Sequence, residues 1–150
     1  MARHENQKLK LLYLKEFIEQ KTDEFHPATM PQILEYLQSR GVEAERKSIY
    51  DDMEALRTLG VDVQSRKGKS PGWFLGERTF QLAELKLLVD AVQSSKFITQ
   101  RKSSELIRKL ESQASVHQAR QLQRQVYVDR RVKSMNESVY YTIDQLHTAI

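Results

Sequence analysis

The sequence predicts a mainly α-helical chain that contains one small β-hairpin. Two observations lead to this fold class: apolar residues recur at helical spacing along most of the chain, and residues 61–75 alternate around a turn rich in Gly, Lys, Ser and Pro. Of its 150 residues, 39% are hydrophobic and 29% charged. This composition is typical of a folded globular protein.

Helices are expected at 6–20, from Thr29 onward, and at about 45–59. Thr29 and Gln32 form a capping box at the start of the second helix, Gly41 ends that helix, and Gly60 ends the third. Apolar residues of the third helix recur at spacings of four and three, which defines a stripe that faces the core. This stripe consists of Ile49, Met53, Leu56 and Leu59.

The hairpin places a basic tip, residues 66–70, between two short strands. Three helices followed by a two-stranded hairpin are the layout of a winged helix-turn-helix. We therefore expect a winged helix-turn-helix at 5–78 and an α-helical connector at 79–135. A final helix is expected at 136–150.

The connector is expected to contain several amphipathic helices, the first with an apolar stripe at Leu82, Leu85, Val89 and Val92. That stripe must pack against another apolar surface. The connector's own helices are the favoured packing partner, and a second subunit is the alternative. An alternation of valines over 126–132 predicts a short extended segment.

Composition excludes several classes of protein. The chain has no cysteine, so it has neither a disulfide framework nor a thiolate metal site. It has no apolar run long enough to span a membrane and no secretory signal, and we expect a cytoplasmic protein. The sequence contains no phosphate-binding loop and no hydrolase or metalloprotease motif. Its four histidines are widely separated, and no two of them lie one helical turn apart. We therefore expect no enzyme activity, no cofactor and no metal.

Net charge alone gives weak support for nucleic-acid binding. The chain carries a formal charge of +4, yet residues 1–78 hold 13 Lys and Arg against 13 Asp and Glu. Local clusters must therefore supply any attraction for a polyanion.

Two such clusters are expected on the winged helix. The start of the third helix carries Arg46, Lys47 and Ser48, where free backbone N–H groups and the helix dipole also favour phosphate. Arg and Lys can read guanine, and Ser48 and Tyr50 can donate to phosphate or a base edge. The tip of the hairpin supplies the second cluster, suited to the DNA backbone. It consists of Arg66, Lys67, Lys69 and Ser70.

Acidic residues in the middle of the third helix need a separate explanation. Asp52 is expected to pair with a cation on a neighbouring helix or on the hairpin, and Glu54 with Arg57 three residues later. Two roles stay open for Asp51: it accepts a hydrogen bond from cytosine N4, or it orients Arg46 or Lys47.

The predicted function is sequence-specific binding of double-stranded DNA by a transcriptional regulator. The main alternative is a winged helix that binds another protein through the acidic middle of its third helix, and the zero charge balance of 1–78 favours it. An RNA-binding winged helix, with Tyr50 and Trp73 stacking on bases, is the weaker third reading.

Three segments together resemble a known family: "RKSIYDDMEALRTLG", "GWFLGERTFQLAELKLLVDAV" and "VYVDRRVKSMNESVYYTIDQLHTAI". They are similar to the N-terminal part of bacterial WYL-domain transcriptional regulators, which carry a DeoR-like winged helix-turn-helix. The resemblance covers essentially all of residues 5–150. It implies a DNA-binding regulator that forms a homodimer, with a helical connector between the DNA-binding and sensory domains.

The sequence departs from that family in two ways. Many members have an Arg-Asp pair in the recognition helix where this chain has Asp51 and Asp52, so the match extends only to Asp52. The β-rich WYL domain itself does not follow, and the helix at 136–150 is expected to be the first of that sensory domain.

Overall fold

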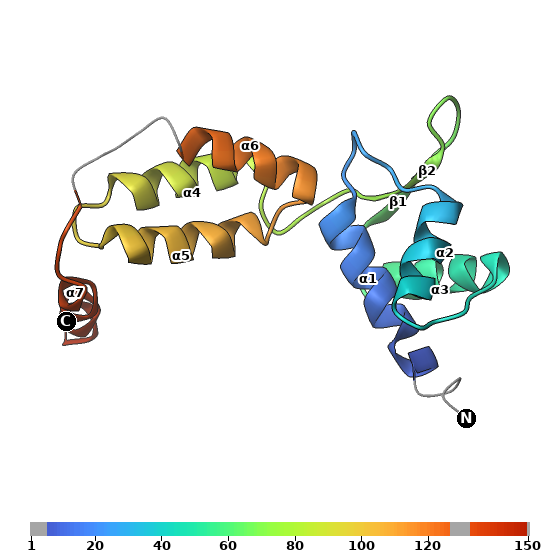
Figure 1. Ribbon diagram of the computed structural model, residues 1–150, viewed down its shortest axis with the longest axis horizontal. Helices are drawn as coiled ribbons and strands as arrows, with labels where there is room; N and C mark the ends of the chain where they lie inside the picture. The colour runs from blue at the N-terminus through green and yellow to red at the C-terminus, as the bar shows by residue number, and fades with distance from the viewer. Residues whose placement is uncertain (1–5, 127–132, 150) are drawn as a thin grey trace. The chain divides into compact units, whose positions relative to one another are not determined.

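The computed structural model describes residues 6–126 and 133–149 and is mainly helical with one antiparallel β-hairpin, as the sequence predicts (Figure 1). The chain separates into two compact units. The first contains residues up to Thr79 together with Ser115–His117, and the second contains Phe80–Ala114 and the residues from Gln118 onward. The predicted extended segment at 126–132 falls almost entirely outside the described residues.

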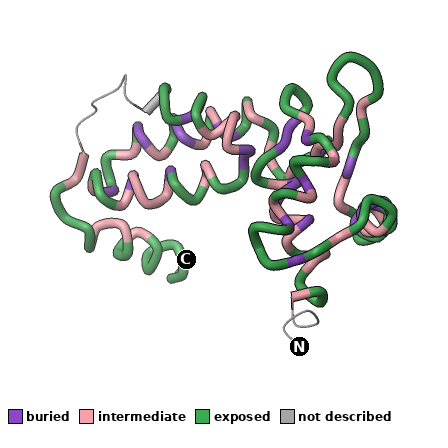
Figure 2. Tube along the Cα trace, turned by 45° about the vertical axis from the view of Figure 1, so that its right-hand side comes forward, coloured by how far each residue is buried: buried purple, intermediate pink, exposed green. Residues whose placement is uncertain are grey.

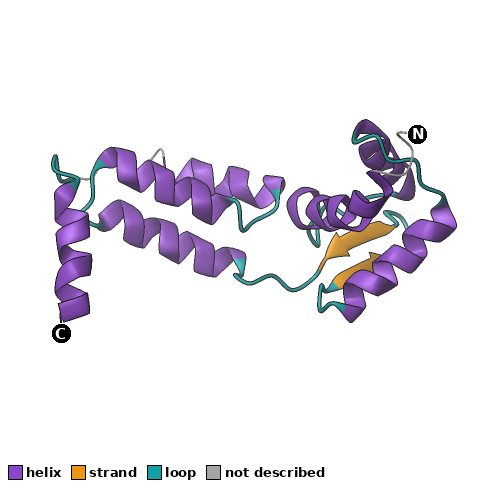
Figure 3. Ribbon diagram, turned by 90° about the horizontal axis from the view of Figure 1, so that it is seen from below, coloured by secondary structure: helices purple, strands orange, loops and turns teal. Residues whose placement is uncertain are grey.

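The first unit begins with a short 3-10 helix, η1 (Asn6–Leu9), and three α-helices. These are α1 (Lys10–Lys21), α2 (Met30–Ser39) and α3 (Arg46–Thr58). The antiparallel strands β1 (Val63–Arg66) and β2 (Gly72–Leu75) follow, and Figure 3 shows them beside the helices of the unit.

The start of α2 has the capping box that the sequence predicts. The Thr29 side chain accepts from the Gln32 backbone N–H at 3.4 Å, and the Gln32 side chain accepts from the Thr29 backbone N–H at 2.9 Å. Both donors would otherwise lack a partner at the helix end. Residue 29 therefore fixes where the second helix begins.

Glycines end both helices of the helix-turn-helix, as predicted. Gly41 has φ +74° and Gly60 has φ +88°. A residue with a Cβ would be destabilised by about 1–2 kcal/mol in this left-handed conformation. The N–H groups of Val42 and Val61 then donate to Leu37 and Leu56, at 2.9 and 3.0 Å. This is the Schellman pattern, and it turns the chain sharply after each helix.

A continuous apolar core joins the three helices to the hairpin. Fully buried side chains come from α1 (Leu14, Ile18), α2 (Ile33, Leu37), α3 (Ile49, Met53, Leu56) and β1 (Val63). Figure 2 colours the buried stretches of the chain purple. Leu59 is not among them: it is 70% exposed, so its predicted place in the stripe is wrong. It lies after the last helical residue, where the chain turns away from the core.

The hairpin is fixed to the helices at two places. Ala28 and Trp73 exchange two backbone hydrogen bonds of 2.8 Å, which adds a short third segment to the sheet. At the far end, the Leu75 N–H donates to the buried Thr22 Oγ1 at 3.1 Å. The Arg78 guanidinium donates to the carbonyls of Glu19 and Thr22, at 2.8 and 2.5 Å. Burial lowers the pKa of this guanidinium, and nearby carboxylates oppose the shift.

The second unit is helical throughout its described part. It contains α4 (Leu82–Ser94), α5 (Gln100–Glu111), α6 (Val116–Val126) and α7 (Ser138–Ala149); the first residues of α6 belong to the first unit. Its core includes Leu85, Val89, Ile107, Ala114 and Leu122. Leu85 and Val89 of the α4 stripe are therefore covered by helices of their own unit, which is the favoured of the two partners expected from sequence. Leu82 and Val92 of the same stripe are half-buried.

Candidate nucleic-acid interface

The third helix presents a mixed-charge face to solvent. Its buried residues Ile49, Met53 and Leu56 define the inner face. At about 100° per residue, Lys47, Asp51 and Glu54 lie on the opposite side, and all three are exposed. The helix therefore has an outward face long enough to contact a partner.

The start of α3 carries two cations, Lys47 on this face and Arg46 at its edge, about 60° from Ile49 around the helix. Arg46 and Lys47 are exposed, and neither forms an ion pair within the described residues. Glu45 occupies the N-cap position without a side-chain cap hydrogen bond. The first backbone N–H groups of α3 are therefore left for an outside acceptor, and the helix dipole adds positive potential there.

Ser48 and Asp52 face a different direction, toward α1. Lys10 Nζ lies 2.8 Å from Asp52 Oδ2, with both side chains less than 20% exposed, and it also donates to Ser48 Oγ. The contact with Asp52 is an ion pair rather than an aligned hydrogen bond, because Oδ2 has no hydrogen-bond partner among the described atoms. Asp52 thus pairs with a neighbouring helix, as expected, and Ser48 is already engaged within the protein.

Breaking this pair should destabilise the first unit. We expect Lys10→Met to lower the free energy of unfolding by about 1–2 kcal/mol, because it leaves a largely buried carboxylate without a cation. Asp52→Asn combined with Lys10→Met should recover part of that loss. Urea titrations of the two single variants and the double variant measure the coupling.

A surface ion pair on the same helix serves as the control. Lys15 Nζ lies 2.6 Å from Glu19, but these side chains are 41% and 38% exposed. We expect Lys15→Met to change the free energy of unfolding by less than about 0.5 kcal/mol. Equal losses for Lys10→Met and Lys15→Met would show that the contact with Asp52 does not hold α1 to α3.

Tyr50 lies beside the hairpin, at one edge of the outward face. Its ring meets that of Trp73 edge to face, at a centroid distance of 5.4 Å, while 52% of the residue stays exposed. Arg57 reaches the same place: its guanidinium lies 5.6 Å from the Trp73 ring centre, and Nε donates to the Val63 carbonyl at 2.7 Å. Arg57 also pairs with Glu54, as the sequence predicts. These contacts fix the hairpin relative to α3.

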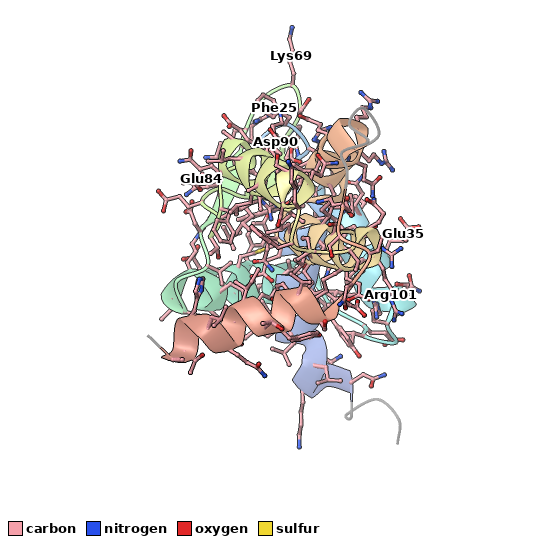
Figure 4. All side chains as sticks on the ribbon, turned by 90° about the vertical axis from the view of Figure 1, so that its left-hand side faces the viewer. Phe25, Glu35, Lys69, Glu84, Asp90 and Arg101 are labelled. Carbon is pink, nitrogen blue, oxygen red and sulfur yellow. The ribbon has the colours of Figure 1, made fainter. Side chains whose placement is uncertain are left out.

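The tip of the hairpin projects from the unit, and Figure 4 shows Lys69 pointing outward there. Lys67, Lys69 and Ser70 are exposed, and neither lysine forms an ion pair within the described residues. Arg66 differs from them. Its guanidinium donates to the Glu24 carbonyl and lies 5.6 Å from the centre of the Phe74 ring. The available cations of the tip are therefore the two lysines.

Most other cations of the first unit are already occupied. Lys10, Lys15, Arg40 and Arg57 form ion pairs, and Arg66 and Arg78 bind backbone carbonyls. Lys8 and Lys21 are exposed like the candidate residues. What distinguishes Arg46, Lys47, Lys67 and Lys69 is their position at the start of α3 and at the tip of the hairpin.

Asp51 makes no ion pair with Arg46 or Lys47 in the described part of the chain. Within the described residues, no ion pair therefore supports a role for Asp51 in orienting those cations. Asp51 is exposed on the outward face. A free carboxylate at this position repels phosphate and accepts hydrogen bonds, so it restricts which base edges or partner groups the helix can meet.

Sequence reasoning missed two residues that shape this surface, Lys10 and Arg57. Lys10 meets residues 38 and 42 positions away, and no local spacing signals such a contact. The pairing of Arg57 with Glu54 was expected from spacing, but its contacts with Val63 and Trp73 depend on how the hairpin folds back.

Comparison of the chain with family models, curated proteins and solved structures finds no match. Within residues 6–126 and 133–149, no group of three or more His, Asp or Glu side chains is placed to hold a metal ion. None of the helices in that same part is long and apolar enough to cross a membrane.

Proposed function

We propose that this protein is a sequence-specific transcriptional regulator that binds double-stranded DNA through its first unit. On this proposal α3 enters the major groove and the hairpin tip contacts the phosphate backbone. The observation that carries it is the pair of unoccupied cation clusters, Arg46–Lys47 and Lys67–Lys69, on a helix-turn-helix with an attached hairpin.

Each exposed residue then has a defined task. Arg46 and Lys47 donate to guanine O6 and N7 or to phosphates near the start of α3. Tyr50 donates from the edge of the helix, and Asp51 accepts from a cytosine amino group. Lys67, Lys69 and Ser70 contact the backbone and set the register of the helix in the groove. In this proposal Ser48 and Arg66 support the interface indirectly. Ser48 holds Lys10 in place, and Arg66 fixes the base of the hairpin.

The resemblance of residues 5–150 to WYL-domain regulators supports the same function. It extends the proposal to a cytoplasmic homodimer, with residues 79–135 as the connector. A two-fold dimer predicts a roughly palindromic site, with half-sites about one helical turn of DNA apart or a multiple of that.

Selection of bound sequences from random duplexes, followed by salt titration, tests this function. We expect an enriched palindromic motif, and a log–log plot of affinity against salt with a slope of about −0.9 for each phosphate contacted. Failure to enrich any sequence, together with no measurable binding to duplex at low salt, would refute DNA recognition.

The alternative is a module that recognises another protein, favoured by the equal numbers of cations and anions in residues 1–78 and by the exposed Asp51 and Glu54. In that case Asp51→Lys should disrupt binding to the partner protein. If DNA is the ligand, the same change should strengthen non-specific duplex binding and steepen its salt dependence. The variant thus separates the two functions.

A further inference from the structure

The last helix of the second unit is incompletely packed. None of the described residues of α7 is buried, although Val139, Tyr140 and Ile143 are half-buried on one face. Figure 2 shows no buried position along this helix, in contrast with α4 and α5. Since an apolar helix face normally gains its stability by burial, this face lacks part of its expected partner surface.

Polar and cation–π contacts connect α7, and the residues just before it, to α4 and α5. The Lys102 ammonium lies 5.4 Å from the Tyr140 ring centre and 5.8 Å from that of Tyr141. Just before α7, Lys133 Nζ donates to the carbonyls of Val92 and Ser95 at the end of α4, at 2.6 and 3.0 Å. These contacts hold the helix near the α4–α5 pair without closing the apolar space between them.

That space is a groove of about 550 Å³. Its walls come from the second half of α4, from Phe97 and Ile98 in the following loop, from α5 and from α7. The apolar lining includes Leu88, Val92, Leu106, Leu110, Tyr140 and Ile143. On α4 and α5 themselves, Leu85, Val89 and Ile107 belong to a closed core. The helix pair is thus closely packed along the face that carries these core residues and open along the face that carries the lining.

We propose that this groove binds an uncharged, largely apolar small molecule. Its volume falls within the range of about 300–1,000 Å³ that is usual for small-molecule sites, which often lie between helices of a bundle. A ligand there would restore dispersion contacts that the open apolar walls lack. This proposal does not depend on DNA binding by the first unit.

The polar groups at the groove define the ligand more closely. Lys109 and Asp144 contribute one cation and one anion, so their formal charges cancel, and Ser95 and His147 supply further hydrogen-bonding groups. Lys102 and Lys133 are not part of the lining, and their ammonium groups are already engaged by tyrosine rings and backbone carbonyls. The lining itself therefore offers a charged ligand no excess of opposite charge. An apolar body with one or two hydrogen-bonding groups matches the lining best.

A second copy of this chain is the competing occupant. A stable protein interface buries about 800 Å² on each partner and is usually broad. The groove is instead a concave space, open to solvent, between three helices and a loop. Leu87, the most exposed apolar residue of α4, lies outside the lining. The concave shape favours a small molecule.

The test uses N-phenyl-1-naphthylamine, an uncharged fluorescent probe, with the full chain. Ala91 lines the groove and is itself exposed, so Ala91→Trp should fill the site without disturbing the core. Ala83, exposed on the same helix and outside the groove, provides the matched control Ala83→Trp. We expect saturable binding of one probe per chain, weakened about tenfold or more by Ala91→Trp and unchanged by Ala83→Trp.

Four outcomes would overturn the proposal. The first is the absence of saturable binding by the wild-type chain, and the second is an equal effect of the two tryptophan variants. The third is conversion of a wild-type dimer to a monomer by Ala91→Trp but not by Ala83→Trp in light scattering, which would make the groove a contact between copies. Tighter binding of the anionic probe 1-anilinonaphthalene-8-sulfonate would reject an uncharged ligand. Circular dichroism of both variants verifies that they fold.

Discussion

Replacing Arg46 and Lys47 together by alanine should reduce affinity for the selected DNA site by about a hundredfold or more. Each well-placed contact to a base edge contributes about 1–3 kcal/mol, and neither side chain has a partner within the described residues that the change would leave unpaired. Both residues are exposed, so the free energy of unfolding should change little. Fluorescence anisotropy with a labelled duplex measures the affinity.

The control removes the same two charges from the second unit. Lys96 and Arg108 are exposed there, and Lys96→Ala combined with Arg108→Ala also removes one lysine and one arginine. We expect this variant to keep discrimination between the selected site and a scrambled duplex. If both double variants weaken binding equally, overall charge rather than α3 determines affinity, and the assignment of the recognition helix is wrong.

Salt dependence then separates the two possible roles of Arg46 and Lys47. If both contact phosphates, the log–log slope should become less steep by about 0.9 for each residue removed. If they read bases, the slope should change less, and the ratio of specific to non-specific affinity should fall.

The second large effect concerns the position of α3 in the fold. Leu56→Ala should lower the free energy of unfolding by about 2–5 kcal/mol, because Leu56 is fully buried and the change leaves a cavity. The loss should also appear as weaker DNA binding at temperatures where the variant is partly unfolded. Urea unfolding followed by circular dichroism measures the difference.

Leu59→Ala is the matched control, with the same chemical change three residues along the chain. Leu59 is 70% exposed, so its truncation should alter the free energy of unfolding by no more than about 0.5 kcal/mol. A loss comparable to that of Leu56→Ala would mean that Leu59 is buried after all, and that the end of α3 packs differently.

Local patterns were sufficient to predict much of the first unit. The capping box at Thr29, the glycines that end α2 and α3, and the inward stripe at Ile49, Met53 and Leu56 are all confirmed. Each depends on interactions within a few residues, where spacing in the sequence fixes spacing in space. Leu59 shows the limit of this reasoning, since helical periodicity stops applying where the helix ends.

By itself, the sequence determined a mainly helical chain with one hairpin, the places where its second and third helices begin and end, and a cationic start to the third helix. The tertiary structure decided which charges remain available. Lys10 occupies Ser48 and Asp52, and the Glu24 carbonyl holds Arg66, while Lys67 and Lys69 stay exposed. These pairings join residues about 40 positions apart, and no periodicity encodes them, because they arise only when the core brings separate elements together.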